Sequence, residues 1–186
     1  MTPLDAQKFK PNEGGPSFPL KHRLIRAMWN ATWLLLASWT PPPMHPWRRF
    51  LLRAFGATIR GKSDVRGSAR VWYPANLLME QNSIIAARVI CYNMAPVYIG
   101  EGAIISQGAH LCAGSHNIRD ENFQLVVKPI HIGKKSWIAA EAFVGPGVEV
   151  GDFAVLGARG VTFRHLEDHG VYVGNPAIKV SSRIVV

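Results

Sequence analysis

The sequence predicts an all-β fold, a parallel β-helix that follows a short helical segment, and two observations support this prediction. Between residues 99 and 161 a branched aliphatic residue recurs at every sixth position, with one interruption, and the next position is usually a very small residue. A period of six matches neither the 3.6-residue period of a helix nor the alternation of a simple strand, and it is typical of β-helix repeats. The aliphatic positions are Ile99, Ile105, Leu111, Ile132, Ile138, Val144, Val150 and Leu156.

Three consecutive hexads make one triangular coil, in which the aliphatic side chains fill the core and the small residues permit tight corners. A weaker form of the repeat precedes the strong stretch, at Ile59, Val65, Val71, Met79, Ile85 and Cys91. Grouping the hexads in threes predicts about five coils, which span 59–76, 79–96, 99–116, 132–149 and 150–167.

The residues left between the predicted coils are 77–78, 97–98 and 117–131. Each insertion follows the third hexad of a coil, so all of them leave the prism from the same corner. Insertions on one face commonly mark the binding face of a repeat protein. His116 is the last residue before the longest insertion, which makes it the first candidate for a functional role.

The chain before the repeat predicts an arm and two helices. Residues 1–19 are rich in Pro, Gly and Lys, and we expect an extended arm there. A helix is predicted from Leu20 to Trp39, ended by three consecutive prolines, and a second short helix from Pro46 to Phe55. The apolar stripe of the first helix is predicted at Leu24, Met28, Leu35 and Trp39. We therefore divide the chain into 1–57 and 58–186, with a candidate active-site loop at 117–131.

Two interpretations of the helical segment remain open. The helices could cap the open end of the β-helix or pack on a neighbouring subunit. Alternatively they could bind a membrane surface, with tryptophans at headgroup depth and basic residues on anionic lipid, although the apolar stretch is too short to span a bilayer. That interpretation uses Trp29, Trp33 and Trp39 together with Lys21, Arg23 and Arg26. The second helix could equally present a solvated basic face.

The composition indicates a globular chain, since 48% of the residues are hydrophobic and 18% are charged. The formal charge of +9 is concentrated in the N-terminal part, without a recognised nucleic-acid motif. We therefore predict no nucleic-acid partner and favour an anionic membrane surface or a phosphate-bearing substrate. Two cysteines, Cys91 and Cys112, form no disulfide framework, and no cleavable signal peptide is evident, so a cytoplasmic location is expected.

Several motifs of the chain resemble the hexapeptide-repeat acyltransferase superfamily, and in particular the sugar O-acetyltransferases of colanic-acid and exopolysaccharide biosynthesis. The resemblance implies left-handed coils and a homotrimer with active sites between subunits. It further implies acetyl transfer from acetyl-CoA to a sugar hydroxyl, on a lipid-linked exopolysaccharide intermediate. The motifs are Trp47-Arg48-Arg49-Phe50-Leu51-Leu52-Arg53, Tyr92-Asn93, Ile104-Ile105-Ser106-Gln107, Gly114-Ser115-His116, Trp137-Ile138-Ala139-Ala140, Phe143-Val144-Gly145-Pro146-Gly147-Val148 and Gly174-Asn175-Pro176-Ala177.

The resemblance assigns the catalytic role to His116. A sugar hydroxyl is a poor nucleophile at neutral pH, so a base must remove its proton as it attacks the thioester. A neutral imidazole suits this task and typically contributes ~10²–10⁴-fold. In this family the acyl group passes directly to the acceptor without an acyl-enzyme. The alternative is that His116 is only a polar residue at the base of the loop.

Acceptor contacts are predicted at Tyr92, Asn93, Ser115 and Asp120. In acetyltransferases of the galactoside and maltose type an asparagine positions the acceptor, but this chain has Ala86 at the matching position. Asn93 lies near the same corner by coil count and is the candidate replacement, with a turn-forming role as the alternative.

The resemblance also predicts a groove for the pantetheine arm of acetyl-CoA. Ala140 and Ala158, one coil apart, would let the arm approach the backbone, and Trp137 would lie beside it or pack at a subunit contact. The Thr-Lys-Asp that usually follows the last hexads is replaced by Phe163-Arg164-His165. Phe163 would stack on the base, and Arg164 or Lys179 would contact phosphates.

The same residues leave other chemistries open. Together with His116, His110 and His131 suggest a metal-dependent hydratase of the γ-carbonic anhydrase kind as an alternative. His110 and His116 are six residues apart, however, so their side chains should point from different faces of the prism, and no metal is expected. A thiol nucleophile at Cys112 has an inert thiol as its alternative. A sugar-nucleotide N-acetyltransferase and a non-catalytic scaffold remain as further alternatives.

Overall fold

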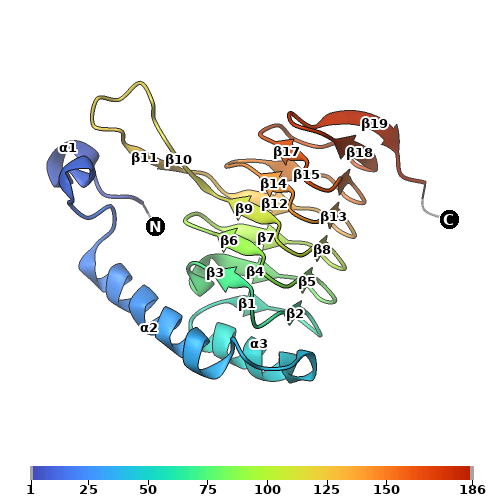
Figure 1. Cartoon of the computed structure of the whole chain (residues 1–186), viewed down its shortest axis with the longest axis horizontal. Helices are drawn as coiled ribbons and strands as arrows, with labels where there is room; N and C mark the ends of the chain where they lie inside the picture. Colours follow the sequence, from blue (N-terminus) through green and yellow to red (C-terminus); the bar gives the residue numbers. More distant parts are fainter. Residues whose placement is uncertain (1, 185–186) are drawn as a thin grey trace.

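The computed structural model describes residues 2–184 and consists of a triangular parallel β-helix with helices at its N-terminal end (Figure 1). Sheet A contains β1 (Thr58–Ile59), β4 (Leu77–Met79), β7 (Val97–Ile99), β12 (Ile130–Ile132) and β15 (Glu149–Val150). Sheet B contains β2 (Asp64–Val65), β5 (Ile84–Ile85), β8 (Ile104–Ile105), β13 (Trp137–Ile138), β16 (Val155–Leu156), β18 (Gly170–Val173) and β19 (Ile178–Ser182). Sheet C contains β3 (Arg70–Val71), β6 (Ile90–Tyr92), β9 (His110–Cys112), β14 (Phe143–Val144) and β17 (Val161–Thr162). The predicted β-helix is confirmed.

The register of the sheets confirms the period of six. Aliphatic positions of successive coils pair directly, as Met79 does with both Ile59 and Ile99, and their side chains are buried in one continuous core. The predicted starts of all five coils agree with these pairings. The last coil is shorter than predicted: Leu166, inside the predicted coil 150–167, already bridges to Val150 one turn below. The chain therefore makes five complete coils and part of a sixth, which β18 and β19 close.

The small residues of the repeat are required at the corner between sheets A and B. A Cβ added to Gly100 would lie 2.7 Å from the carbonyl carbon of Gly133, directly above it in the next coil. No side chain tolerates such a contact with backbone, so glycine keeps the coils stacked at this corner.

The N-terminal segment is more structured than the predicted extended arm. It contains α1 (Ala6–Phe9) and the 3-10 helix η1 (Pro11–Glu13), and then α2 (Leu20–Leu36), η2 (Pro42–Met44) and α3 (His45–Ala54) follow. A further 3-10 helix, η3 (Pro74–Asn76), lies between β3 and β4. No helix in the described part of the chain is long and apolar enough to cross a bilayer.

The buried face of α2 differs from the predicted stripe. His22, Trp29 and Trp33 are the buried side chains of this helix. The predicted stripe residues are instead between 56% and 68% exposed: Leu24, Met28, Leu35 and Trp39. α2 also ends at Leu36, before Trp39. The reason is that the two buried indoles find hydrogen-bond acceptors on the β-helix, which the aliphatic side chains could not use.

These acceptors belong to the first coil. Each coil donates its N–H groups to the carbonyls of the next coil, as Arg60 does to Met79 at 2.8 Å, so the first coil keeps unpaired carbonyls at the open end. We call the carbonyls of Ile59, Ser63, Val65, Gly67, Ala69 and Val71 the carbonyl rim. Trp29 Nε1 donates to Val71 at 2.6 Å, and Trp33 Nε1 donates to Gly67 and Ala69 at 2.9 and 3.0 Å.

Three arginines of α3 supply the remaining donors to the carbonyl rim. Arg48 Nε donates to Val65 at 2.6 Å, Arg49 to Ser63 at 2.8 Å and Arg53 Nε to Ile59 at 3.1 Å. Arg48 is fully buried and also donates to Thr40, Pro41 and Pro42. Buried backbone carbonyls need such partners. The interpretation of the second helix as a solvated basic face is therefore wrong for Arg48, whereas Arg53 is exposed although it donates to the carbonyl rim. The placement of Trp29 and Trp33 at a membrane surface is also wrong.

Candidate active site

The longest insertion leaves the prism at the corner between sheets C and A, as predicted, whereas residues 77–78 and 97–98 belong to strands β4 and β7. The longest one forms an antiparallel hairpin of β10 (Gly114–His116) and β11 (Leu125–Val127), and it extends beyond the β-helix in Figure 1. The hairpin starts at Gly114, inside the predicted third coil, and the next coil begins at Ile130. A Cβ on Gly114 would lie 2.7 Å from Met94 Sδ, so glycine lets the base of the hairpin pack on the preceding insertion.

His116 ends β10, and its ring orientation is fixed by Phe123 from the same hairpin. The two rings stack at 4.5 Å with an interplanar angle of 12°, and Nδ1 lies 2.8 Å from the Phe123 carbonyl oxygen. A carbonyl can only accept a hydrogen bond, so Nδ1 carries the proton in the neutral ring. The Nε2 of His116 then has a free lone pair, which is the form that a general base requires.

A cavity of about 260 Å³ lies beside His116. The β-helix contributes Trp72, Tyr92 and Met94 to its walls, and the hairpin contributes Leu125. A larger hollow of about 950 Å³ lies between α2 and sheet C, against Trp29 and Trp33, but His116 is not part of it. The smaller cavity is therefore the candidate acceptor site, because it is the one of the two that His116 lines.

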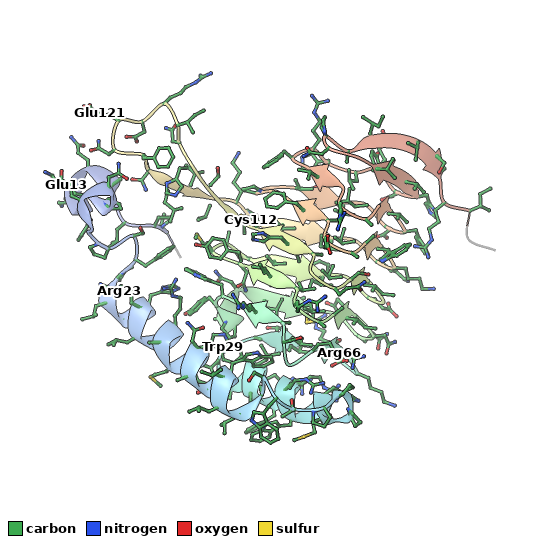
Figure 2. The ribbon with its side chains drawn as sticks, viewed as in Figure 1. Glu13, Arg23, Trp29, Arg66, Cys112 and Glu121 are labelled. Atoms are coloured by element: carbon green, nitrogen blue, oxygen red, sulfur yellow. The ribbon has the colours of Figure 1, made fainter. Side chains whose placement is uncertain are left out.

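The N-terminal segment forms the remaining wall of this cavity, with Ser17, Phe18, Arg23 and Arg26. Figure 2 shows Arg23 near the start of α2. Glu13, in the arm, lies on the same side of the molecule as the hairpin turn with Glu121. Gln124 of the hairpin holds the arm in place: its Oε1 accepts from Ala6 N at 2.7 Å and its Nε2 donates to Leu4 O at 3.1 Å.

Sequence reasoning missed this wall. Phe18, Met94 and Leu125 form a buried cluster against Trp72 and Tyr92, but no local pattern connects residues so far apart in the sequence. The membrane interpretation makes Arg23 and Arg26 lipid contacts, whereas both face the cavity beside His116. The basic character of the helix was the available signal, and only the fold shows which way those side chains point.

Arg26 lies over Trp72, with its guanidinium carbon 4.1 Å from the ring centroid. Burial lowers the pKa of Arg26 from its usual value; the nearby Tyr92 raises it in part, and the charge of Arg23 lowers it again. Burial likewise raises the pKa of Tyr92, as does Cys112, while Arg26 lowers it. The cavity is thus cationic and partly withdrawn from water.

The predicted acceptor residues are placed differently from one another. Tyr92 lines the cavity. Asn93 is fully buried, and its amide bonds the Tyr73 backbone at both ends: Oδ1 accepts from N at 2.9 Å and Nδ2 donates to O at 2.8 Å. Ser115 is exposed on β10, and Asp120 Oδ1 accepts from Asn122 N within the hairpin turn at 2.8 Å. Among these, only Tyr92 shares the cavity with His116.

The predicted groove residues lie at other edges of the same chain. Ala140 and Ala158 stack at the corner between sheets B and C, where Arg159 N donates to Ala140 O at 2.9 Å. Trp137 is 45% exposed on sheet B, and its Nε1 donates to Ser106 Oγ at 2.8 Å.

The residues predicted for the adenine end are spread along the last coil and β19. Phe163 follows β17 and contacts Phe143, with ring centroids 5.5 Å apart, and the exposed Arg164 is the next residue. Lys179 on β19 forms an ion pair with Glu167 at 2.6 Å. Within residues 2–184, these side chains do not meet His116 in a cavity.

The remaining histidines and cysteines occupy separate places. His110 on β9 lies between Tyr92 and Phe143, and burial lowers its pKa. His131 stacks on Tyr98 on sheet A. Cys91 is buried, which raises the pKa of its thiol to about 12. Cys112 Sγ donates to Gly114 O at 3.2 Å. In the described chain no three His, Cys, Asp or Glu side chains are grouped so that they could hold a metal ion.

The chain is a parallel β-helix with a histidine-bearing hairpin at one corner, and comparisons with known proteins identify its family. The chain is 37% identical over 157 residues to the colanic acid biosynthesis acetyltransferase WcaF of Escherichia coli (strain K12), and the match covers 84% of this chain and 86% of that one. The chain belongs to the hexapeptide-repeat acetyltransferase family. No model of a protein family matches it.

Solved structures show the same fold at lower identity. A maltose O-acetyltransferase from Clostridium difficile 630 superposes with a TM-score of 0.81, at 21% identity, over 90% of both chains. A hexapeptide-repeat acetyltransferase from Vibrio cholerae O1 biovar eltor, complexed with acetyl coenzyme A, superposes with a TM-score of 0.79, at 19% identity, over 89% of this chain and 91% of that one.

Proposed function

We propose that the protein transfers an acetyl group from acetyl-CoA to a sugar hydroxyl in exopolysaccharide biosynthesis, with His116 as the general base. The family and the identity to a colanic acid biosynthesis acetyltransferase support the reaction and the acceptor class. The observation that carries the role of His116 is its hydrogen bond to the Phe123 carbonyl at 2.8 Å, which leaves Nε2 as the free nitrogen of a ring that lines a small cavity.

The chemistry of each step follows from this tautomer. Nε2 takes the hydroxyl proton as the sugar oxygen bonds to the thioester carbonyl carbon, and the carbonyl π electrons move onto its oxygen. The Phe123 carbonyl stabilises the imidazolium that forms, because it accepts from Nδ1. When the tetrahedral intermediate collapses, the C–S bond breaks, and the imidazolium returns its proton to the departing thiolate. His116 ends neutral, and the products are the sugar ester and CoA.

Replacing His116 tests this assignment. In His116→Ala the release of CoA with an accepted sugar should fall by ~10²–10⁴-fold, since this is the usual contribution of a general base. His131→Ala is the matched control, because His131 is also exposed and stacked on an aromatic ring but lies on sheet A. Circular dichroism and light scattering should be unchanged in both variants. Turnover that survives in His116→Ala would contradict the role of His116.

We further propose that three copies assemble and that the acetyl-CoA groove forms between them. His116 stands at the C–A corner, whereas Trp137, Ala140 and Ala158 lie on sheet B and at the B–C corner, so one chain does not complete the site. Exposed Ile104 and Trp137 pair in register on the outer face of sheet B and offer an apolar contact surface. Arg164 and Lys179 are the candidate phosphate contacts of this groove.

Peripheral binding to an anionic membrane is the last part of the proposal. α2 exposes Leu24, Met28 and Leu35, α3 exposes Phe50, and Trp39 is exposed between the two helices. Exposed Lys21 lies on the same helix as Leu24. An apolar helix face with nearby cations is suited to a lipid interface, where a lipid-linked acceptor would be found. Leu24→Glu/Leu35→Glu should abolish retention on vesicles with anionic lipid. Retention equal to that of the wild-type chain would contradict this part.

A further inference from the structure

Two arginines in the cavity have no counter-charge. None of the nine residues that line the cavity is acidic. Other cations of the described chain do pair with carboxylates, for example Arg60 with Glu80 at 3.0 Å and Arg159 with Glu141 at 2.7 Å. Within residues 2–184, neither Arg23 nor Arg26 takes part in such a pair.

Leaving Arg26 without a partner costs more free energy than leaving Arg23 without one. The Nε of Arg26 is buried and, within the described chain, lacks a hydrogen-bond partner. A buried polar atom without a partner costs free energy, and a partly buried charge costs more. The stacking on Trp72 offsets only part of this cost, because a ring face attracts the cation but accepts no conventional hydrogen bond from Nε. An anionic ligand would supply the counter-charge that the cavity lacks.

We propose that the acceptor is an anionic sugar, whose carboxylate or phosphate group is bound by Arg23 and Arg26 while the reacting hydroxyl lies at His116. Guanidinium groups recognise both oxyanions through paired, charge-assisted hydrogen bonds. This inference rests on the proposed function, since it names the acceptor class of the same site.

The size of the cavity restricts where the acceptor can carry its anionic group. At about 260 Å³ the cavity is smaller than the usual range of small-molecule sites, ~300–1,000 Å³. His116 and both arginines line this one space. The anionic group therefore belongs to the sugar that is acetylated or is attached directly to it, and is not on a distant residue of an oligosaccharide.

The test uses three probes that share one ring: methyl β-glucopyranoside, methyl β-glucuronide and glucose 1-phosphate. Dissociation constants are measured by calorimetry, and kcat/KM by release of CoA from acetyl-CoA. The wild-type protein should favour an anionic probe over the neutral one by about tenfold or more. The carboxylate and phosphate probes identify which oxyanion the site prefers.

Arg26→Gln and Arg23→Gln should each reduce this preference, while Arg26→Lys should retain part of it. Lys21→Gln is the control, since Lys21 is an exposed cation of the same helix outside the cavity. Equal affinity for neutral and anionic probes in the wild-type protein would overturn the inference, as would a preference that survives Arg23→Gln/Arg26→Gln. Transfer to the neutral probe that depends on His116 would uphold the proposed function even then. Tighter binding of an anionic probe without transfer would uphold the inference about the arginines and contradict the proposed function.

Discussion

Two groups of arginines lie close together in the sequence but serve different purposes. Arg48, Arg49 and Arg53 donate to the carbonyl rim of the first coil, where each guanidinium has fixed backbone acceptors. Arg23 and Arg26 face a cavity without an acidic wall. A cation whose partners are part of the fold stabilises the fold, whereas a cation without partners is available to a ligand. The hydrogen-bond partners of a charge therefore separate the two roles better than the local sequence does.

The largest expected effect follows from removing Arg48. Arg48→Met would leave several carbonyls and Asp64 without their buried donor, and removal of one partner of a buried charged network typically costs about 3–5 kcal/mol. Urea unfolding measures this loss. Arg48→Lys should recover little of it, because an ammonium cannot reach the same acceptors as a planar guanidinium. A loss of unfolding free energy below about 1 kcal/mol would show that the carbonyl rim does not need the Arg48 guanidinium.

An intermediate effect is expected from Trp33→Phe. This change keeps an aromatic ring but removes the donor to Gly67 and Ala69, and buried acceptors without a partner cost about 1–3 kcal/mol. The same unfolding experiment applies. Stability equal to that of the wild-type protein would mean that water replaces the indole N–H and that the ring alone accounts for the burial of Trp33.

The smallest effect on stability is expected at the cavity. Arg26→Gln removes a partly buried charge and its stacking on Trp72, two contributions of opposite sign, so unfolding should change by no more than about 1 kcal/mol. A destabilisation as large as that of Arg48→Met would make Arg26 a structural residue and remove the distinction between the two groups.

The sequence predicts the β-helix well because its signal is repeated. Each hexad reports the same core position, and every coil adds another copy, so counting in sixes, with two extra residues between the coils, aligns Met79 with Ile99. The same counting locates the insertion corner and His116. The end of the run is predicted less well, since Leu166 starts a sixth turn after a shortened edge that interrupts the period.

The helical segment is predicted less accurately because its buried face is chosen by hydrogen bonds and not by hydrophobicity. The aliphatic stripe with Leu24 and Leu35 is exposed, whereas Trp29 and Trp33 turn inward to the carbonyl rim. The cavity wall at Phe18 and Arg26 depends on the arm docking on the hairpin through Gln124. Such a long-range contact leaves no periodic pattern in the sequence.

The role of His116 depends most on which nitrogen of its ring is free to act as a base. Nitrogen-15 chemical shifts of the imidazole, recorded on protein labelled at histidine and assigned with His116→Ala, measure this directly. In the neutral ring we predict a protonated Nδ1, held by the Phe123 carbonyl, and an unprotonated Nε2. A neutral ring with its proton on Nε2 would contradict the role proposed for His116.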